Sequence, residues 1–181
     1  MAFDPSGSLL ATAGHDTIRL WDPAINQDSG TLIRNLEGHT GWVRSVAFDP
    51  SGSLLATAGN DNTIRLWDPA TGTLIRSLEG HTGWVLSVAF DRSGGMLATG
   101  GHDRTIRLWD LATGTLLVSA YNDDFGLSLI AADGHIAPAS ETTRLRFVQG
   151  WAVFPLTMAR HRLTDAFNAT APVRALLERA G

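Results

Sequence analysis

The sequence contains no cysteine and no lysine, and its apolar runs are short. Without cysteine the chain can form no disulfide, no thiolate metal site and no cysteine nucleophile. No run approaches the roughly 20 apolar residues that cross a bilayer, and the N-terminal residues 1–5 lack the basic and apolar regions of a secretory signal. The 18 acidic and 14 basic residues leave a net charge of −4, which excludes the broad basic surface of a nucleic-acid binder. We therefore expect a cytoplasmic protein that binds neither nucleic acid nor membrane.

The sequence is dominated by an internal repeat. AFDPSGSLLATAG occurs at 2–14 and again at 47–59, and the related AFDRSGGMLATGG occurs at 89–101. The hexapeptide TIRLWD follows shortly after each of these copies, and LEGHTGWV occurs at 36–43 and at 78–85. Repetition at this spacing is typical of folds that are built from similar modules in succession.

One complete unit reads as four short strands joined by tight turns. The runs rich in Val, Ile, Leu, Trp and Thr are Trp42–Phe48, Leu54–Ala58, Thr63–Trp67 and Thr73–Leu78, a pattern that favours antiparallel β-structure. These runs are apolar on both faces, so a single four-stranded sheet would leave one apolar face in water. Stacking such sheets around an axis gives a β-propeller, which buries both faces.

The motifs of these units resemble WD40 repeats. The matching dipeptides are Gly38-His39 with Trp67-Asp68, Gly80-His81 with Trp109-Asp110, and Trp21-Asp22 in a partial first unit. The resemblance implies an all-β fold of about three WD40-like β-propeller blades plus a degenerate fourth, in an open or incomplete ring, with a short helical C-terminal tail. The expected units are 1–37 (partial first blade), 38–79 (second blade), 80–120 (third blade), 121–155 (degenerate β segment) and 156–181 (helical tail).

A closed propeller needs about four to eight blades, more than these units supply. Two alternatives follow. The chain is the C-terminal segment of a longer propeller, or else it forms an open stack or self-associates so that several copies complete a ring.

The C-terminal third departs from the repeat. Leu127–Ala131 is the expected inner strand of the degenerate blade, with further strands over Arg144–Val148 and Trp151–Phe154. Helical periodicity over 156–167 and 171–179 predicts two short helices, which either cap a sheet edge or dock on a partner. This segment resembles the tail that follows WD40 arrays in bacterial multidomain proteins, so we expect a bacterial protein.

The resemblance also implies a buried hydrogen-bond network in each complete blade. Its members are His39, Thr57, Asp61 and Trp67 in the second unit and His81, Thr99, Asp103 and Trp109 in the third. The first unit has Thr12, Asp16 and Trp21 but no histidine ahead of them. Threonine, histidine and aspartate can also form a nucleophilic triad, but a set that recurs in every complete unit favours a structural role. We expect no catalytic residue.

By the same resemblance, partners bind at the rim formed by the loops that precede the inner strands and those that join the two middle strands. The residues expected there are Trp42, Arg44, Asn60, Trp84, Leu86, His102 and His15. Exposed tryptophan and arginine are typical of binding hot spots, although Trp42 and Trp84 could instead pack over their own loops. His15 and His102 lack a second ligand at fixed spacing, so we expect no metal site.

The function that these observations favour is a non-catalytic scaffold that displays rim residues to a protein or peptide partner, with no cofactor. The alternative is a sensor or regulatory propeller piece of a larger bacterial signalling enzyme, a kinase or caspase-like peptidase, whose catalytic domain lies upstream. We find no glycine-rich loop that opens a helix, as a phosphate-binding site would need.

Overall fold

The computed structural model describes residues 1–23, 30–123, 126–131, 136–137, 146–148 and 151–153. All regular structure in these residues is β-strand. No helix among them is long and apolar enough to cross a lipid bilayer. The two helices expected within 156–181 lie outside the described residues.

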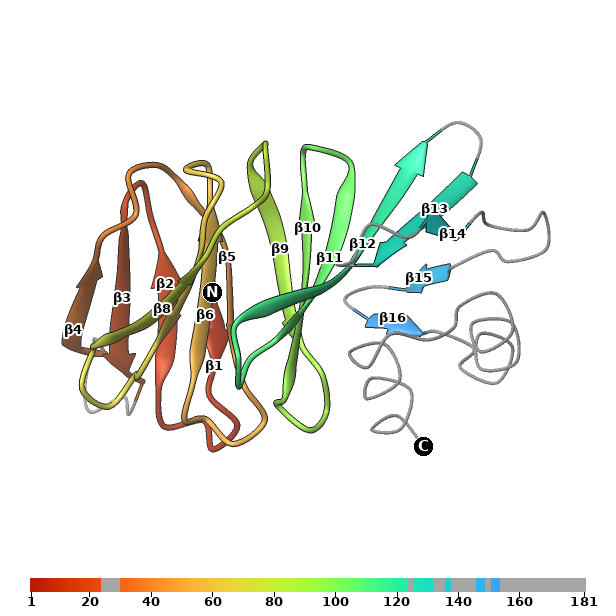
Figure 1. Ribbon diagram of the computed structural model, residues 1–181. Coiled ribbons are helices and arrows are strands. Elements are labelled where there is room, and N and C mark those ends of the chain that lie inside the picture. Colours follow the sequence, from red (N-terminus) through yellow and green to blue (C-terminus); the bar gives the residue numbers. More distant parts are fainter. Residues whose placement is uncertain (24–29, 124–125, 132–135, 138–145, 149–150, 154–181) are drawn as a thin grey trace.

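Three antiparallel sheets follow one another along the chain and stand side by side (Figure 1). The first sheet contains β1 (Ala2–Phe3), β2 (Leu10–Ala13), β3 (Thr17–Asp22) and β4 (Thr31–Glu37). The second contains β5 (Val43–Phe48), β6 (Leu55–Gly59), β7 (Ile64–Trp67) and β8 (Leu74–Leu78). The third begins with β9 (Val85–Phe90), β10 (Met96–Gly101), β11 (Thr105–Asp110) and β12 (Thr115–Asp123). We refer to these sheets as the first, second and third blades.

Tight turns between the strands keep the repeated residues in register. In the second blade the amide of Gly52 donates to the carbonyl of Asp49 at 3.0 Å, and Gly52 has a φ of 76° that glycine adopts without strain. The Asp49 carboxylate also accepts from the amide of Leu54 at 2.7 Å, at the end of the turn.

The strand register repeats from blade to blade. In each blade the second strand pairs with the third so that a threonine lies opposite an arginine: Thr12 with Arg19, Thr57 with Arg65, and Thr99 with Arg107.

The apolar core lies between the blades rather than within any one of them. One cluster joins the first blade to the second and includes Ile18, Leu20 and Trp67. The other joins the second blade to the third and includes Ile64, Leu66 and Trp109. Both faces of the second blade are therefore covered, as the two-sided apolar pattern predicts, and β6 is buried along its whole length.

Hydrogen bonds also cross from blade to blade. The amide of Val43 donates to the carbonyl of Gly14 at 3.1 Å, and the amide of Val88 donates to the hydroxyl of Ser45 at 3.2 Å. These bonds link the inner strand β5 to its neighbours on either side and fix the relative height of the blades. The rim positions of successive blades are therefore held level with one another.

The expected place of Leu127–Ala131 is wrong. In the structure β13 (Gly126–Ala131) pairs with β12 as the next strand outward, and β14 (Ile136–Ala137) pairs with β13. The third sheet therefore has six strands, and β13 is not the inner strand of a fourth blade. Its position beside β12 follows from the nine-residue length of β12, which offers a long ladder of backbone groups to the strand that comes next. The strands β15 (Arg146–Val148) and β16 (Trp151–Val153) form a separate hairpin, close to the two runs expected there.

Candidate functional site

A chain of hydrogen bonds runs through the second blade from its rim to its buried tryptophan. His39 Nδ1 lies 2.7 Å from Asp61 Oδ2, and His39 Nε2 lies 2.8 Å from Thr57 Oγ1. The indole of Trp67 donates to the same Thr57 hydroxyl at 2.8 Å. The Asp61 carboxylate also accepts from Thr63 Oγ1 at 2.9 Å. Loop, second strand and third strand are thereby tied together around one imidazole.

The proton positions in this chain follow from the donors available. Trp67 can only donate, so it uses an acceptor lone pair of Thr57 and leaves the Thr57 proton for His39 Nε2. His39 is then neutral, with its proton on Nδ1 and directed to Asp61. Burial lowers the pKa of His39 below its usual value, against the raising effect of the Asp61 carboxylate, which agrees with a neutral ring.

The third blade repeats the arrangement. His81 lies 2.9 Å from Asp103 Oδ2 and 2.8 Å from Thr99 Oγ1, and the indole of Trp109 donates to Thr99 at 3.0 Å. Burial of Asp103 acts to raise its pKa, but hydrogen bonds from Thr105, His81 and the Thr82 amide outweigh it and lower the pKa to about 2. Burial lowers the pKa of His81 as it does that of His39.

The glycine ahead of each histidine is required by its backbone conformation. Gly38 has a φ of 145° and Gly80 a φ of 139°, in a region that other residues rarely adopt. A Cβ atom on Gly38 would also collide with the guanidinium of Arg65, and one on Gly80 with that of Arg107. The contact of this glycine with the arginine was not predicted from the sequence, although both residues recur at fixed positions in the repeat.

This geometry does not suit the hydroxyls for nucleophilic attack. Thr57 is fully buried and Thr99 nearly so, and each hydroxyl is already engaged by both an indole and an imidazole. No group of three or more potential metal ligands gathers among the residues that the structure describes. These side chains tie the strands of each blade to one another.

The predicted rim residues lie on one edge of the three blades, and most of them contact one another. We call His15, Trp42, Arg44, Asn60, Trp84 and His102 the rim row. His15 of the first blade meets Trp42 of the second edge to face, with ring centroids 5.2 Å apart. Trp84 and His102, both of the third blade, have centroids 5.5 Å apart. Arg44 contacts both tryptophans and joins these two pairs, so the rim row is continuous across three blades.

Arg44 occupies the centre of the rim row. Its guanidinium carbon lies 5.7 Å from the ring centroid of Trp42 and 5.7 Å from that of Trp84, within the range of cation–π attraction. Its Nε donates to the side-chain carbonyl of Asn60 at 2.8 Å. Among the described residues no carboxylate lies within ion-pair distance of Arg44, so its terminal amino groups face no acidic partner there.

The tryptophans of the rim row are exposed although they contact their neighbours. Trp42 retains 51% of its accessible surface and Trp84 retains 47%. Backbone bonds hold both in place: the Asn60 amide donates to the Trp42 carbonyl at 2.9 Å, and the His102 amide to the Trp84 carbonyl at 2.7 Å. Leu86 takes the position of Arg44 in the third blade and is also exposed. The face therefore carries ordered aromatic surface in contact with solvent.

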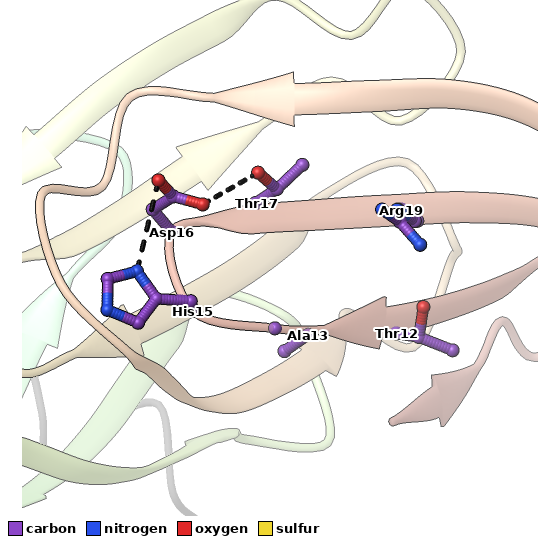
Figure 2. A pocket seen from close by; sticks show the side chains of 7 residues that line it. Thr12, Ala13, His15, Asp16, Thr17 and Arg19 are labelled. Carbon is purple, nitrogen blue, oxygen red and sulfur yellow. Dashed lines mark hydrogen bonds and ion pairs between the residues drawn. The ribbon is translucent and has the colours of Figure 1, made fainter.

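The first blade has an incomplete version of the buried network. The indole of Trp21 donates to Thr12 Oγ1 at 2.8 Å, and Thr17 Oγ1 donates to Asp16 Oδ1 at 2.9 Å. No described residue occupies the place that His39 and His81 take in the other blades. A hollow of about 280 Å³ lies there, lined by Thr12, Ala13, Gly14, His15, Asp16, Thr17 and Arg19 (Figure 2).

The comparison with known families agrees with this repeated architecture. A sequence model described as "WD domain, G-beta repeat" matches residues 1–22, 30–68 and 72–110, which together make up more than half of the chain. The chain belongs to the WD40 family. The first matched segment spans β1 to β3, and each of the other two spans the last strand of one blade and the first three strands of the next, β4 to β7 and β8 to β11. The network residues of the second and third blades fall within these WD40 repeats.

Individual WD40 relatives match over one part of the chain. "Nuclear distribution protein PAC1" of Arthroderma benhamiae is 41% identical over 64 residues, which are 35% of this chain and 13% of that protein. The proteins of the same name from Trichophyton verrucosum and Tuber melanosporum are 41% and 40% identical over the same shares. All three relatives are fungal. The matched segment thus covers about an eighth of the length of these relatives.

Proposed function

We propose that this chain is a non-catalytic protein-interaction scaffold, and that the rim row binds a peptide segment of a partner protein. The observation that carries the proposal is the row of exposed aromatic rings and one guanidinium that crosses three rigid blades. WD40 repeats are suited to binding proteins or peptides in general, and this face has the side chains that typically dominate binding energies, namely tryptophan and arginine.

The contacts within the rim row favour partner binding over the alternative that each tryptophan only packs on its own loop. A side chain that only covered its own loop would contact residues of its own blade. Both indoles do contact their own blade, Trp42 through Arg44 and Trp84 through His102. In addition, Trp42 contacts His15 of the preceding blade, and Trp84 contacts Arg44 of the preceding blade. The contacts hold both indoles in one orientation while about half of each stays in solvent. A ligand would then bind without the entropy cost of ordering these side chains.

Arg44 favours a partner segment that carries an acidic side chain next to an apolar one. Its Nε is used by Asn60 and its position is held by two indoles, so the terminal amino groups can form paired hydrogen bonds with a carboxylate. The neighbouring faces of Trp42 and Trp84 would bury the apolar side chain. Neither the family match nor the relatives support the alternative of a sensor piece of a kinase or peptidase.

The proposal is tested by selecting peptides from a random display library on the intact chain. Binding of the selected peptides is then measured on wild type, Trp84→Ala and Ile75→Ala. Ile75 is the matched control because it is 53% exposed but lies on the outer strand β8. We expect Trp84→Ala to weaken binding about tenfold or more and Ile75→Ala to leave it unchanged. Equal binding to wild type and Trp84→Ala, or a larger loss with Ile75→Ala, would contradict the proposal.

A further inference from the structure

The second and third blades are nearly identical in sequence where they form the rim. Their inner strands and the loops ahead of them read HTGWVRSVAF at 39–48 and HTGWVLSVAF at 81–90. Their middle turns and third strands read GNDNTIRLWD at 59–68 and GHDRTIRLWD at 101–110. The differences within these stretches are Arg44 against Leu86, Asn60 against His102, and Asn62 against Arg104. The third difference gives the third blade a cation that the rim row does not include.

The backbone of Arg104 has a conformation that suits asparagine better than arginine. The φ of Arg104 is 62°, and the φ of Asn62 at the same place in the second blade is 64°. In both turns the amide of this residue donates to the carbonyl of the glycine three positions earlier, at 3.2 Å for Arg104 and 3.3 Å for Asn62. Asparagine is among the residue types that enter this left-handed region most readily after glycine. The turn itself therefore gives no reason for an arginine at position 104.

The side chain of Arg104 is exposed. Within the part of the chain that the structure describes, its guanidinium forms no hydrogen bond and no ion pair. The carboxylate of the neighbouring Asp103 is only 5% exposed, and it already accepts from His81, from the Thr82 amide and from Thr105. The guanidinium of Arg104 is thus available to a ligand.

Arg104 extends the rim row at its third-blade end. It lies in the same turn as His102, whose ring centroid is 5.5 Å from that of Trp84. The ring of Trp84 is in turn 5.7 Å from the guanidinium carbon of Arg44. The two cations come from different elements, Arg44 from the inner strand β5 and Arg104 from the turn between β10 and β11. The exposed indole of Trp84 therefore lies between one cation and the turn that carries the other.

We propose that Arg104 is a specificity-determining residue of this face, which selects partner segments with two acidic side chains on either side of an apolar one. One carboxylate pairs with Arg44, the apolar side chain packs on Trp84, and the second carboxylate pairs with Arg104. This inference rests on the function proposed above for the rim row. A guanidinium suits the role because it can bind a carboxylate through two parallel hydrogen bonds.

The contacts along the rim also set the spacing of the two acidic residues. The steps from Arg44 to Trp84 and from Trp84 to His102 are each shorter than 6 Å, and Arg104 follows His102 in the same turn. An extended segment advances about 3.3 Å per residue. The two acidic residues should therefore be about three to five positions apart. A segment with a single acidic residue still binds to Arg44 and Trp84, but more weakly.

The test uses the intact chain and peptides selected on it from a random display library. Fluorescence polarisation measures how a selected peptide binds to wild type, Arg104→Asn, Trp84→Ala and Arg92→Asn. Arg104→Asn copies the residue of the second blade, so the thermal midpoint should stay at or above that of wild type. Arg92 is the matched control because it is an exposed arginine of the same blade, in the turn at the opposite end of β10. We expect Arg104→Asn to weaken binding about fivefold and Arg92→Asn to leave it unchanged.

Paired changes in peptide and protein identify the acidic residue that Arg104 meets. Each acidic residue of the peptide is replaced in turn by its amide. One replacement should weaken binding to wild type about fivefold and leave binding to Arg104→Asn unchanged. The same loss on both proteins would overturn the proposal, as would selected peptides with a single acidic residue or an equal loss with Arg92→Asn. A thermal midpoint of Arg104→Asn below that of wild type would mean that the fold needs this arginine, which also contradicts the proposal.

The Trp84→Ala variant separates this inference from the function on which it rests. If Trp84→Ala weakens binding and Arg104→Asn does not, the role of Arg104 is refuted and the rim row remains the binding site. If no peptide binds, or if binding survives Trp84→Ala, both proposals are refuted.

Discussion

The guanidinium of Arg44 contacts the indole of Trp84, which belongs to the next blade, with its central carbon 5.7 Å from the ring centroid. This contact joins two blades at their exposed edge. Because Arg44 also contacts Trp42 of its own blade, it holds the two exposed tryptophans in a fixed arrangement.

Arg44→Leu copies the residue that the third blade has at this position, Leu86. We expect it to weaken binding of a selected acidic peptide by about tenfold and to remove most of the salt dependence of that binding. The free energy of unfolding should fall by no more than about 1 kcal/mol, because an exposed cation–π contact contributes little. Titration at low and high salt measures the first effect, and urea unfolding the second. Unchanged affinity and salt dependence would remove Arg44 from the proposed site.

Trp67→Phe tests the buried network of the second blade. The variant loses the indole donor to Thr57 and leaves a small cavity, so it should destabilise the chain by about 1–3 kcal/mol. Trp42→Phe is the matched control on the rim and should change stability by less than about 0.5 kcal/mol. Urea midpoints, monitored by circular dichroism, compare the two. If Trp42→Phe proved the more damaging variant, the division into rim and network would be incorrect.

The buried histidines predict how stability depends on pH. Burial lowers the pKa of His39 and of His81 in the folded chain, so the unfolded chain binds more protons as the pH falls below the ordinary value of 6.5. Their contribution is fully present above pH 6.5 and is lost as the pH drops through the lowered folded pKa. The urea midpoint should therefore decrease from pH 7 to pH 5. The double variant His39→Asn/His81→Asn should be less stable at pH 7 but should show a flatter pH profile, and a slope equal to that of wild type would contradict this origin.

Asp103 and Asp16 form a natural comparison, because they occupy the same place in a complete and an incomplete blade. The Asp103 carboxylate accepts from Thr105, His81 and the Thr82 amide, so Asp103→Asn should cost about 1.5–3 kcal/mol. Asp16→Asn, on a side chain that is 60% exposed, should cost less than about 0.5 kcal/mol.

The same comparison has a pH signature. The pKa of Asp103 is lowered to about 2, so its contribution is complete above pH 3.8 and is lost as the pH falls toward 2. The penalty for Asp103→Asn should therefore shrink in that acidic range. Titration of the carboxyl carbon by NMR gives the pKa itself, and a value near 4 would mean that the hydrogen bonds do not hold the ionised form.

The strands of the repeat could be predicted closely because the residue types within each run and the turn residues beside it are local properties of the sequence. Short runs rich in Val, Ile, Leu, Trp and Thr, bounded by turn residues, placed the second-blade strands within one residue of β5 to β8. Contacts between blades could not be read in the same way. Arg44 and Trp84 are 40 positions apart, and nothing local says that a guanidinium will meet an indole of the next unit. The network, by contrast, repeats within each unit, so its members could be named from the family resemblance.

The place of β13 shows a different limit. Its sequence favours a strand, but alternation of apolar residues does not specify which edge the strand will pair with. β12 continues to Asp123 and β13 starts at Gly126, so a hairpin back onto β12 forms at once. Pairing with the nearest open edge took precedence over starting a new blade. A shorter β12, ending where β8 ends in the second blade, would lose the pairs that Tyr121, Asn122 and Asp123 make with β13.

The central claim is that the rim row, and not the buried network, meets the partner. Tryptophan indole signals in a proton–nitrogen NMR spectrum test it directly, because both kinds of site carry this group. On saturation with a selected peptide, the indole signals of Trp42 and Trp84 should shift, while those of Trp67 and Trp109, which donate to buried threonines, should stay in place. Unmoved Trp42 and Trp84 signals in the presence of saturating peptide would contradict the account.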